Sequence, residues 1–384
     1  MSDSIAILER LIAFPTVSHR SNLAMINFIR QTLEECGVAC QIIADESGQK
    51  ANLYATIGPT DRPGVMLSGH TDVVPVEGQG WTRDPFNLSE TDGLLYGRGS
   101  TDMKGFIACA LNAARRASSM QLKTPLHLAF SYDEEIGCVG VRHLIEVLAE
   151  APVKPKFCLI GEPTLLQVAT AHKGKVAMRA ICRGVECHSA MAPLGLNAIH
   201  LAADLMAEIR ALQADIEKSG TRDGDYDVPY TTLHAGFISG GTALNIVPNL
   251  CTLDFEIRNL AADDPETLLA QIVSRADNLV DQARAGGAEA AMIEFEPIHR
   301  YPGLDTPPDS DIVGFVKSLT GANSTTKLSF GTEGGLFDQS LGVPTVVCGP
   351  GSMAQGHKPD EFIARTEMDR CDEMLANLLD RLVD

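Results

Sequence analysis

Short apolar segments alternate with helical patterns in the first 160 residues of the chain. Residues 22–37 place apolar side chains at the spacing of one helix face. Four apolar segments have the length of buried strands: residues 51–57, 64–68, 126–130 and 157–160. Short strands that alternate with helices form a mostly parallel sheet with helices packed against it. The sequence therefore predicts an α/β domain.

A different order of elements follows residue 174. The patterns are strands at 175–183, 231–238, 251–258 and 290–296, and helices at 196–217 and 264–284. Their order, β-α-β-β-α-β, is that of a ferredoxin-like α+β unit. We therefore expect a larger domain of residues 1–174 and 297–384, with a ferredoxin-like domain of residues 175–296 inserted into it.

Charge and cysteine usage disfavour several kinds of partner. The 384 residues include 50 acidic and 31 basic side chains, and this formal charge of −19 disfavours nucleic acids and anionic membranes. The 10 cysteines form no Cys-x-x-Cys pair and are typical of reduced thiols. The N-terminal segment lacks the pattern of an export signal, and no apolar run approaches the length of a membrane span. We therefore expect a cytoplasmic protein that binds neither nucleic acid nor membrane.

Acids and histidines collect at the ends of the predicted strands of the larger domain. They are His70, Asp72, Asp102, Glu134, Glu135, Glu162 and His357. Open α/β sheets bind ligands at the carboxyl ends of their strands, so we expect these side chains to meet. Oxygen and imidazole donors without thiolates suit Zn²⁺, Co²⁺ or Mn²⁺, and the surplus of carboxylates would compensate two neighbouring ions.

Each of these motifs also has an ordinary alternative. An isolated His-x-Asp pair is more often polar structure than a ligand site, and the acids after residue 132 could be a solvated cluster or the start of a helix. GRGSTD invites comparison with a dinucleotide fingerprint, but Asp102 stands where the third glycine belongs, and the chain has no Walker A motif. A single shared site explains why all of these acids and histidines lie at strand ends. Separate explanations for each motif would leave that common position to chance.

Several long motifs carry a family resemblance. They are GHTDVVPVEGQGWTRDPF, LYGRGSTDMKG, DEEIGCVG, IGEPT, CHSAMAPLGLNAI, GGTALNIVPNLC and GPGSMAQGHKPDE. Together they resemble the di-zinc amidohydrolases, a family of aminoacylases, carboxypeptidase G-type enzymes, succinyl-diaminopimelate desuccinylases and acetylornithine deacetylases. The resemblance spans nearly the whole chain. It implies a metal-bearing catalytic domain and a ferredoxin-like lid domain through which a homodimer could form.

The resemblance also implies a ligand set for two Zn²⁺ ions, with Co²⁺ as a possible substitute. Asp102 would bridge the ions. His70 and Glu162 would complete one site, and Glu135 and His357 the other.

Three further residues receive catalytic roles from the same resemblance. Asp72 would orient His70, and Glu134 would be the general base that takes a proton from metal-bound water and returns it to the leaving amine. Adjacent residues of an extended chain point in opposite directions, so Glu134 and Glu135 can have different roles. His188, in the lid, would polarise the scissile carbonyl, either in its own chain or across a dimer; alternatively it is a surface histidine near a turn.

The substrate implied is an N-acyl amino acid with a free carboxylate. Arg258 and Asn245 are candidate partners for that carboxylate, although Arg258 could instead pair with Glu256. The segment SFGTEGGLF resembles acetylornithine deacetylases, whereas desuccinylases usually have Gly-Thr-Ser-Asp-Gly-Arg-Phe there. We therefore expect N2-acetyl-L-ornithine, with Glu333 as the acceptor for its ammonium group or, alternatively, as a helix cap. A desuccinylase, a carboxypeptidase or dipeptidase, and a non-catalytic metal-binding regulator stay open.

Overall fold

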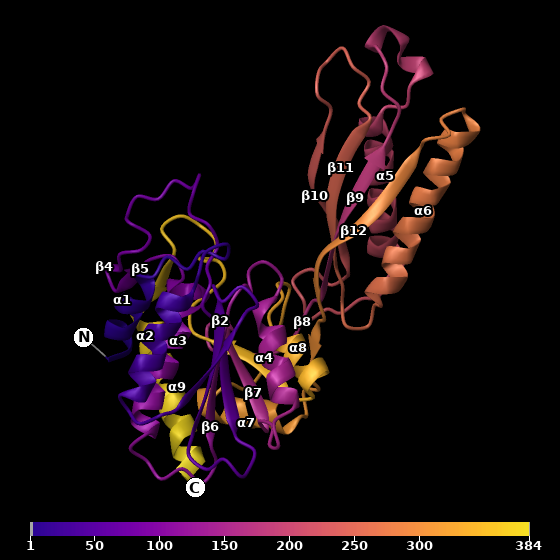
Figure 1. Cartoon of the computed structure of the whole chain (residues 1–384). Coiled ribbons are helices and arrows are strands. Elements are labelled where there is room, and N and C mark those ends of the chain that lie inside the picture. Colours follow the sequence, from indigo (N-terminus) through magenta and orange to yellow (C-terminus); the bar gives the residue numbers. More distant parts are fainter. Residues whose placement is uncertain (1–2, 384) are drawn as a thin grey trace. The chain divides into compact units, whose positions relative to one another are not determined.

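The computed structural model describes residues 3–383, so residues 1–2 and 384, the outer ends of the expected catalytic domain, lie outside it (Figure 1). The chain divides into two compact units. The larger unit contains the chain up to Ala171, then Leu304–Lys327, and the chain from Thr332 onward. The smaller unit contains His172–Gly303 and Leu328–Gly331. Within residues 3–383, no helix is both long and apolar enough to cross a membrane.

The larger unit is built on a sheet that has nine strands within the described residues. The order is β1 (Cys40–Ala44), β2 (Ala51–Ile57), β6 (Leu126–Ser131), β3 (Val65–His70), β7 (Phe157–Pro163), β15 (Thr345–Gly349), β8 (Val168–His172) and β13 (Leu304–Asp305), with β14 (Thr325–Leu328) paired to β8. The central strands β6, β3, β7 and β15 are parallel neighbours. Every residue of these four strands is buried, which explains their continuous apolar runs.

Helices and short irregular segments cover this sheet. They are α1 (Asp3–Ile12), α2 (Leu23–Glu34), α3 (Gly105–Ala117), α4 (Gly140–Ala149), α7 (Asp311–Thr320), α8 (Gly334–Leu336), α9 (Arg365–Val383), η1 (Ser100–Lys104) and η3 (Phe337–Leu341). Gly161 of β7 lets α3 approach closely, because a Cβ there would lie 1.9 Å from the ring of Phe106. The sheet and helices confirm the predicted α/β class.

A small separate sheet joins distant parts of the larger unit. Its strands lie in the order β16 (Phe362–Ala364), β5 (Leu94–Tyr96) and β4 (Ser89–Thr91). In the antiparallel pair of β16 and β5, Phe362 lies opposite Tyr96. The sheet therefore brings the start of the GRGSTD motif next to the end of the HKPDE motif.

The smaller unit has the order β9 (Lys175–Arg183), η2 (Ser189–Leu194), α5 (Ala198–Ser219), β10 (Thr232–Gly240), β11 (Leu250–Arg258), α6 (Pro265–Ala285) and β12 (Met292–Tyr301). Its antiparallel sheet has the order β10-β11-β9-β12, and α5 and α6 lie side by side on one face (Figure 1). This is the predicted ferredoxin-like arrangement. β12 runs beyond residue 296 to Tyr301, because pairing with β9 resumes after an irregularity between Pro297 and His299.

Candidate metal and catalytic site

The predicted ligands come from neighbouring strand ends of the larger unit. His70 is the last residue of β3, Glu162 lies near the end of β7, and Glu135 follows β6. Asp102 lies in η1, between the small sheet and α3, and His357 follows β15. Because β6, β3, β7 and β15 are parallel neighbours, their carboxyl ends meet at one edge of the sheet.

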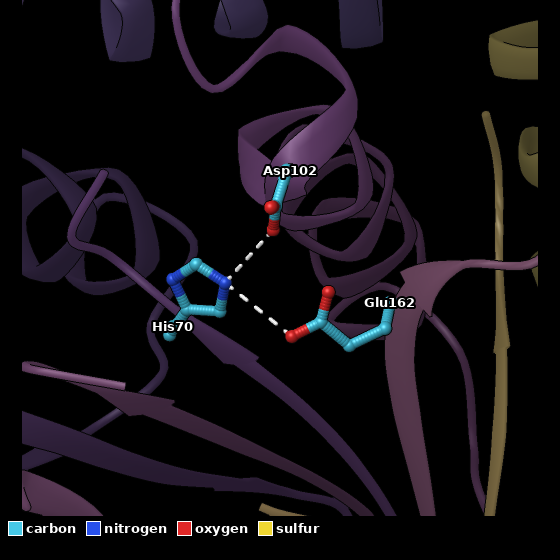
Figure 2. Close-up of side chains that lie close together, drawn as sticks. All are labelled: His70, Asp102 and Glu162. Atoms are coloured by element: carbon cyan, nitrogen blue, oxygen red, sulfur yellow. Dashed lines mark hydrogen bonds and ion pairs between the residues drawn. The ribbon is translucent and has the colours of Figure 1, made fainter. Parts of the chain in front are cut away.

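One group of donors consists of His70, Asp102 and Glu162, and its ligand atoms lie within 4.8 Å of one another. Figure 2 shows the imidazole of His70 facing both carboxylates. Its Nε2 lies 3.1 Å from Oδ1 of Asp102 and 3.4 Å from Oε1 of Glu162. All three residues are buried, which keeps the donors in fixed directions.

The second group consists of Asp102, Glu135 and His357. Nε2 of His357 lies 3.1 Å from Oδ2 of Asp102 and 3.0 Å from Oε2 of Glu135. Asp102 therefore presents one carboxylate oxygen to each histidine, which is the arrangement expected of a bridging ligand. The side chain of His357 is 48% exposed, so this group borders solvent more than the first.

Asp72 organises the residues around the first group. Its backbone carbonyl lies 3.0 Å from Nδ1 of His70 and suits a protonated Nδ1, which leaves Nε2 as a metal donor. Its carboxylate accepts hydrogen bonds from the backbone N–H groups of Glu134 and Glu135, at 3.0 and 3.3 Å, and from the hydroxyl of Ser18 at 2.8 Å. The two acids therefore lie in a turn held by Asp72, rather than on the extended chain that the sequence suggested.

The residues present fit divalent cations. The donors are imidazole nitrogens and carboxylate oxygens, and buried Oε2 of Glu162 has no hydrogen-bond partner among the described residues. Burial, with the neighbouring charge of Asp102, raises the pKa of Glu162 to about 8. Burial opposes ionisation of Asp102, but His357 and His70 hold the pKa of that carboxyl well below its usual range. Cations in the two groups would relieve this crowding of negative charge.

Glu134 lies beside the ligands but belongs to neither group. Burial raises its pKa well above the usual value, and the charges of Glu162 and Glu135 act in the same direction. Its Oε1 lies 3.5 Å from Sγ of Cys138, which is placed to donate a weak hydrogen bond. A carboxylate with a raised proton affinity next to a metal site is suited to accept and return a proton.

Glu333 is a buried acid of the larger unit. It stands at the N-cap position of α8 but makes no side-chain capping hydrogen bond. Its Oε1 is buried and has no hydrogen-bond partner within residues 3–383. Burial raises its pKa to about 7, although the nearby hydroxyl of Ser131 lowers it. The side chain therefore has an unused acceptor.

The remaining predicted residues belong to the smaller unit. His188 is exposed, and its Nδ1 accepts a hydrogen bond of 3.1 Å from the backbone of Ala190. Asn245 lies on the adjoining loop, where its backbone carbonyl accepts a 3.0 Å hydrogen bond from the backbone N–H of Ser189. Arg258 ends β11 and contacts Glu256 at 3.0 Å and the hydroxyl of Tyr301 at 2.7 Å. The structure thus brings His188 and Asn245 together, while Arg258 lies at the opposite end of β11 from both.

Two buried charges beside the metal groups were not among the predicted site residues. Arg98 and Glu361 form an ion pair of 2.6 Å with both side chains 1% exposed. In the sequence, the only indication of this pair was that Arg98 lies inside the motif GRGSTD and Glu361 inside the motif HKPDE. Such charges are usually exposed, so the motifs alone gave no reason to pair them.

A family model and several sequence relatives match most of the chain. Residues 66–381 match the family described as "Peptidase family M20/M25/M40". The chain is 35% identical to the acetylornithine deacetylase of Proteus mirabilis (strain HI4320) over 386 residues, covering 98% of this chain and 96% of the relative. It is 35% identical to that of Shigella sonnei (strain Ss046) over 369 residues, covering 94% and 92%.

Solved structures share the fold. The M20 family metallo-carboxypeptidase Sso-CP2 from Sulfolobus solfataricus has a TM-score of 0.79 at 19% identity, with 100% of this chain and 99% of that chain covered. The Bacillus subtilis YXEP protein, described as a dinuclear metal binding peptidase, has a TM-score of 0.67 at 16% identity, with 99% and 97% covered. The family match and the 35% identical relatives confirm the family resemblance seen in the sequence motifs, and the solved structures agree with it in fold.

Proposed function

The chain belongs to the peptidase family M20/M25/M40 and is a metal-dependent hydrolase, and from this premise we propose that it cleaves N2-acetyl-L-ornithine to L-ornithine and acetate. The observation that carries the proposed chemistry is the carboxylate of Asp102, which faces His70 and His357 with one oxygen each while Glu134 lies beside them. The 35% identity to acetylornithine deacetylases supports the choice of substrate. Such a reaction would serve arginine biosynthesis in the cytoplasm, and the ten free cysteines suit a reducing compartment.

Two divalent ions, Zn²⁺ or Co²⁺, would be held by the two donor groups. His70, Asp102 and Glu162 would bind one ion, and Asp102, Glu135 and His357 the other. When bound, the ions supply Lewis acidity, which polarises the acyl carbonyl and strengthens water as a nucleophile at neutral pH.

Glu134 moves the proton in the proposed reaction. Its carboxylate takes a proton from the attacking water as the new C–O bond forms, and gives it to the amine nitrogen as the C–N bond breaks. The products are then acetate and the free α-amine. Asp72 supports this step, because its carboxylate holds the backbone of Glu134 and its carbonyl orients His70.

Three of the proposed substrate contacts are residues of the smaller unit. Arg258 and Asn245 would bind the α-carboxylate, and His188 would donate to the oxygen of the scissile carbonyl. Arg258 is the last residue of the nine-residue strand β11, whose two ends lie roughly 27 Å apart at about 3.4 Å a residue, and Asn245 lies on the loop that precedes the first residue of the strand. One carboxylate cannot contact both ends of the same strand. This distance supports a homodimer in which His188 and Asn245 act on the substrate of the partner subunit.

Glu333 would distinguish acetylornithine from neutral N-acetyl amino acids. A bound ammonium group would supply a partner for its Oε1, which has none in the described part of the chain, and would favour its ionised form. The absence of a side-chain capping bond at α8 argues against the alternative role of helix cap.

A hydrolysis panel tests the proposed function. Metal-reconstituted protein is assayed with N2-acetyl-L-ornithine, N-acetyl-L-methionine, N-succinyl-diaminopimelate and dipeptides, and kcat/KM is compared. We expect the highest value for acetylornithine. Preference for the succinylated compound or for dipeptides would assign the chain to another branch of its family, and no turnover of any substrate would favour a non-catalytic metal-binding protein.

A further inference from the structure

A buried hydrogen-bond network surrounds Arg98 and Glu361, outside the two donor groups. The small sheet creates it, because Phe362 pairs with Tyr96 and the ladder continues with a 2.9 Å hydrogen bond from the N–H of Gly97 to the carbonyl of Glu361. Arg98 and Glu361 are thereby placed next to each other, although they are 263 residues apart in the sequence.

Glu361 holds the backbone that carries the bridging aspartate. Its Oε2 accepts the 2.6 Å bond from Nη1 of Arg98, while its Oε1 accepts hydrogen bonds from the backbone N–H groups of Thr101 and Asp102, at 3.0 and 3.2 Å. A carboxylate that accepts several bonds in a buried place restricts the groups that donate them. The direction of the Asp102 side chain depends on this backbone.

Arg98 extends the network to the other loops of the site. Its Nη1 also donates to the carbonyl of Lys358 at 3.3 Å, and its Nη2 donates to Oε1 of Gln79 at 2.5 Å and to the carbonyl of Pro75 at 3.4 Å. Gln79 in turn donates from Nε2 to the carbonyl of His357 at 3.1 Å. One guanidinium thus joins three chain segments: the one after His70, the one before Asp102 and the one after His357.

We propose that Arg98, Glu361 and Gln79 form a positioning network that fixes the loops bearing Asp102 and His357, and thereby sets the affinity of the site for divalent ions. The three residues contribute no ligand atom to the two donor groups. Their effect runs through the backbone of Asp102 and His357. Outer partners of this kind typically change metal affinity by about 10- to 100-fold when they are replaced.

The inference rests on the metal binding that the proposed function includes, and its test does not depend on the amide that is cleaved. Co²⁺ is titrated into the metal-free full-length protein, and its visible absorption reports both affinity and coordination geometry. Glu361→Gln keeps an oxygen for the two backbone N–H groups but presents an amide N–H₂ to Arg98. We expect Co²⁺ to bind this variant about 10- to 100-fold more weakly, with an altered absorption spectrum.

Gln79→Leu is a second variant that should be less destabilising than Glu361→Gln, because it leaves the buried ion pair of Arg98 and Glu361 intact. It removes the hydrogen bond to the carbonyl of His357 and the two bonds that Oε1 of Gln79 accepts from Arg98 and Trp81. Because the backbone that is released carries His357, we expect a loss of about 10-fold, largest for the ion bound by Glu135 and His357. Glu90→Gln is the matched control. It removes the charge from the 2.5 Å pair between Glu90, in β4 of the small sheet, and Arg365, the first residue of α9. Neither residue is a partner of Arg98, Glu361 or Gln79 among the described contacts, so Co²⁺ affinity should stay unchanged.

The outcomes separate this inference from the proposed function. Circular dichroism and thermal unfolding establish that each variant is folded. If folded Glu361→Gln and Gln79→Leu proteins bind Co²⁺ with the affinity of the parent, the proposed role of the network is wrong. An equal loss of Co²⁺ affinity in Glu90→Gln would also contradict it. A parent that binds no Co²⁺ would instead refute the proposed function, and the inference with it.

Discussion

The backbone N–H of Glu134 lies 3.0 Å from Oδ1 of Asp72, so the residue proposed as general base is held by the residue that orients His70. The backbone and the carboxylate of Glu134 therefore have different constraints. The backbone position depends on Asp72, while the carboxylate remains outside both donor groups. A change confined to the carboxylate should therefore alter proton transfer without altering metal binding.

Glu134→Gln tests this expectation. The amide side chain keeps the shape and the backbone hydrogen bond but cannot take a proton, so we expect the rate to fall by about 10² to 10⁴. Elemental analysis of the dialysed variant should give a metal content close to that of the parent. Turnover near the parental rate would rule out Glu134 as the proton carrier.

Removing either histidine ligand should lower metal occupancy itself. His70→Ala and His357→Ala each take one donor from a different group, and each should reduce the metal content from about two ions per chain toward about one. Elemental analysis after dialysis measures the loss, and Glu134→Gln is the control with the ligands intact. Full occupancy in both histidine variants would contradict the assignment of the two groups.

The sequence predicted the strands whose buried apolar side chains form a recognisable pattern. β2 and β9 occupy the predicted residues 51–57 and 175–183, because an inner strand is recognisable from its own side chains. The pairing of β16 with β5 could not be inferred, since short strands of mixed exposure carry no such pattern. The strand-end acids and histidines were recognisable within their motifs. The Arg98–Glu361 pair required the three-dimensional structure, because its partners come from distant segments.

The role of His188 is tested by mixing variants. If His188 acts across a dimer, subunits carrying His188→Ala and subunits carrying Glu134→Gln form mixed dimers in which one of two sites has both residues. Random mixing should then restore roughly a quarter of the parental activity, because half of the dimers are mixed and each has one complete site. Activity is measured after the subunits have been dissociated and reassociated. No gain over the separate variants would indicate that His188 acts within its own chain.

The buried histidine His127 should make stability depend on pH. Burial lowers the pKa of His127 to about 4, below the value of about 6.5 expected in the unfolded chain. The unfolded chain therefore binds the additional proton, so the contribution of His127 is complete above about pH 6.5 and is lost as the pH falls toward 4. Replacing His127 by Gln should reduce the pH dependence of the free energy of unfolding by at most about 1.4 kcal/mol per pH unit in this window.

Urea unfolding of metal-free protein in EDTA at several pH values measures this dependence without the contribution of metal release. Burial also lowers the pKa of His172 and His299 to about 4, so only the difference between His127→Gln and the parent is informative. His19→Gln, which changes an exposed histidine, is the control. Identical pH dependence in the parent and His127→Gln would show that His127 is not responsible.

Substrate specificity should depend on the carboxylate of Glu333. The acid is buried, and among residues 3–383 it makes no capping bond and its Oε1 has no hydrogen-bond partner, so a cationic side chain of the substrate would gain a charged hydrogen bond there. Glu333→Gln should lower kcat/KM for N2-acetyl-L-ornithine by an amount equivalent to about 1.5 to 3 kcal/mol, and leave kcat/KM for N-acetyl-L-methionine nearly unchanged. Comparing both substrates in one preparation removes any difference in metal content. An equal loss on both would show that Glu333 supports the fold or the metal groups, because only recognition of the ammonium group distinguishes the two substrates.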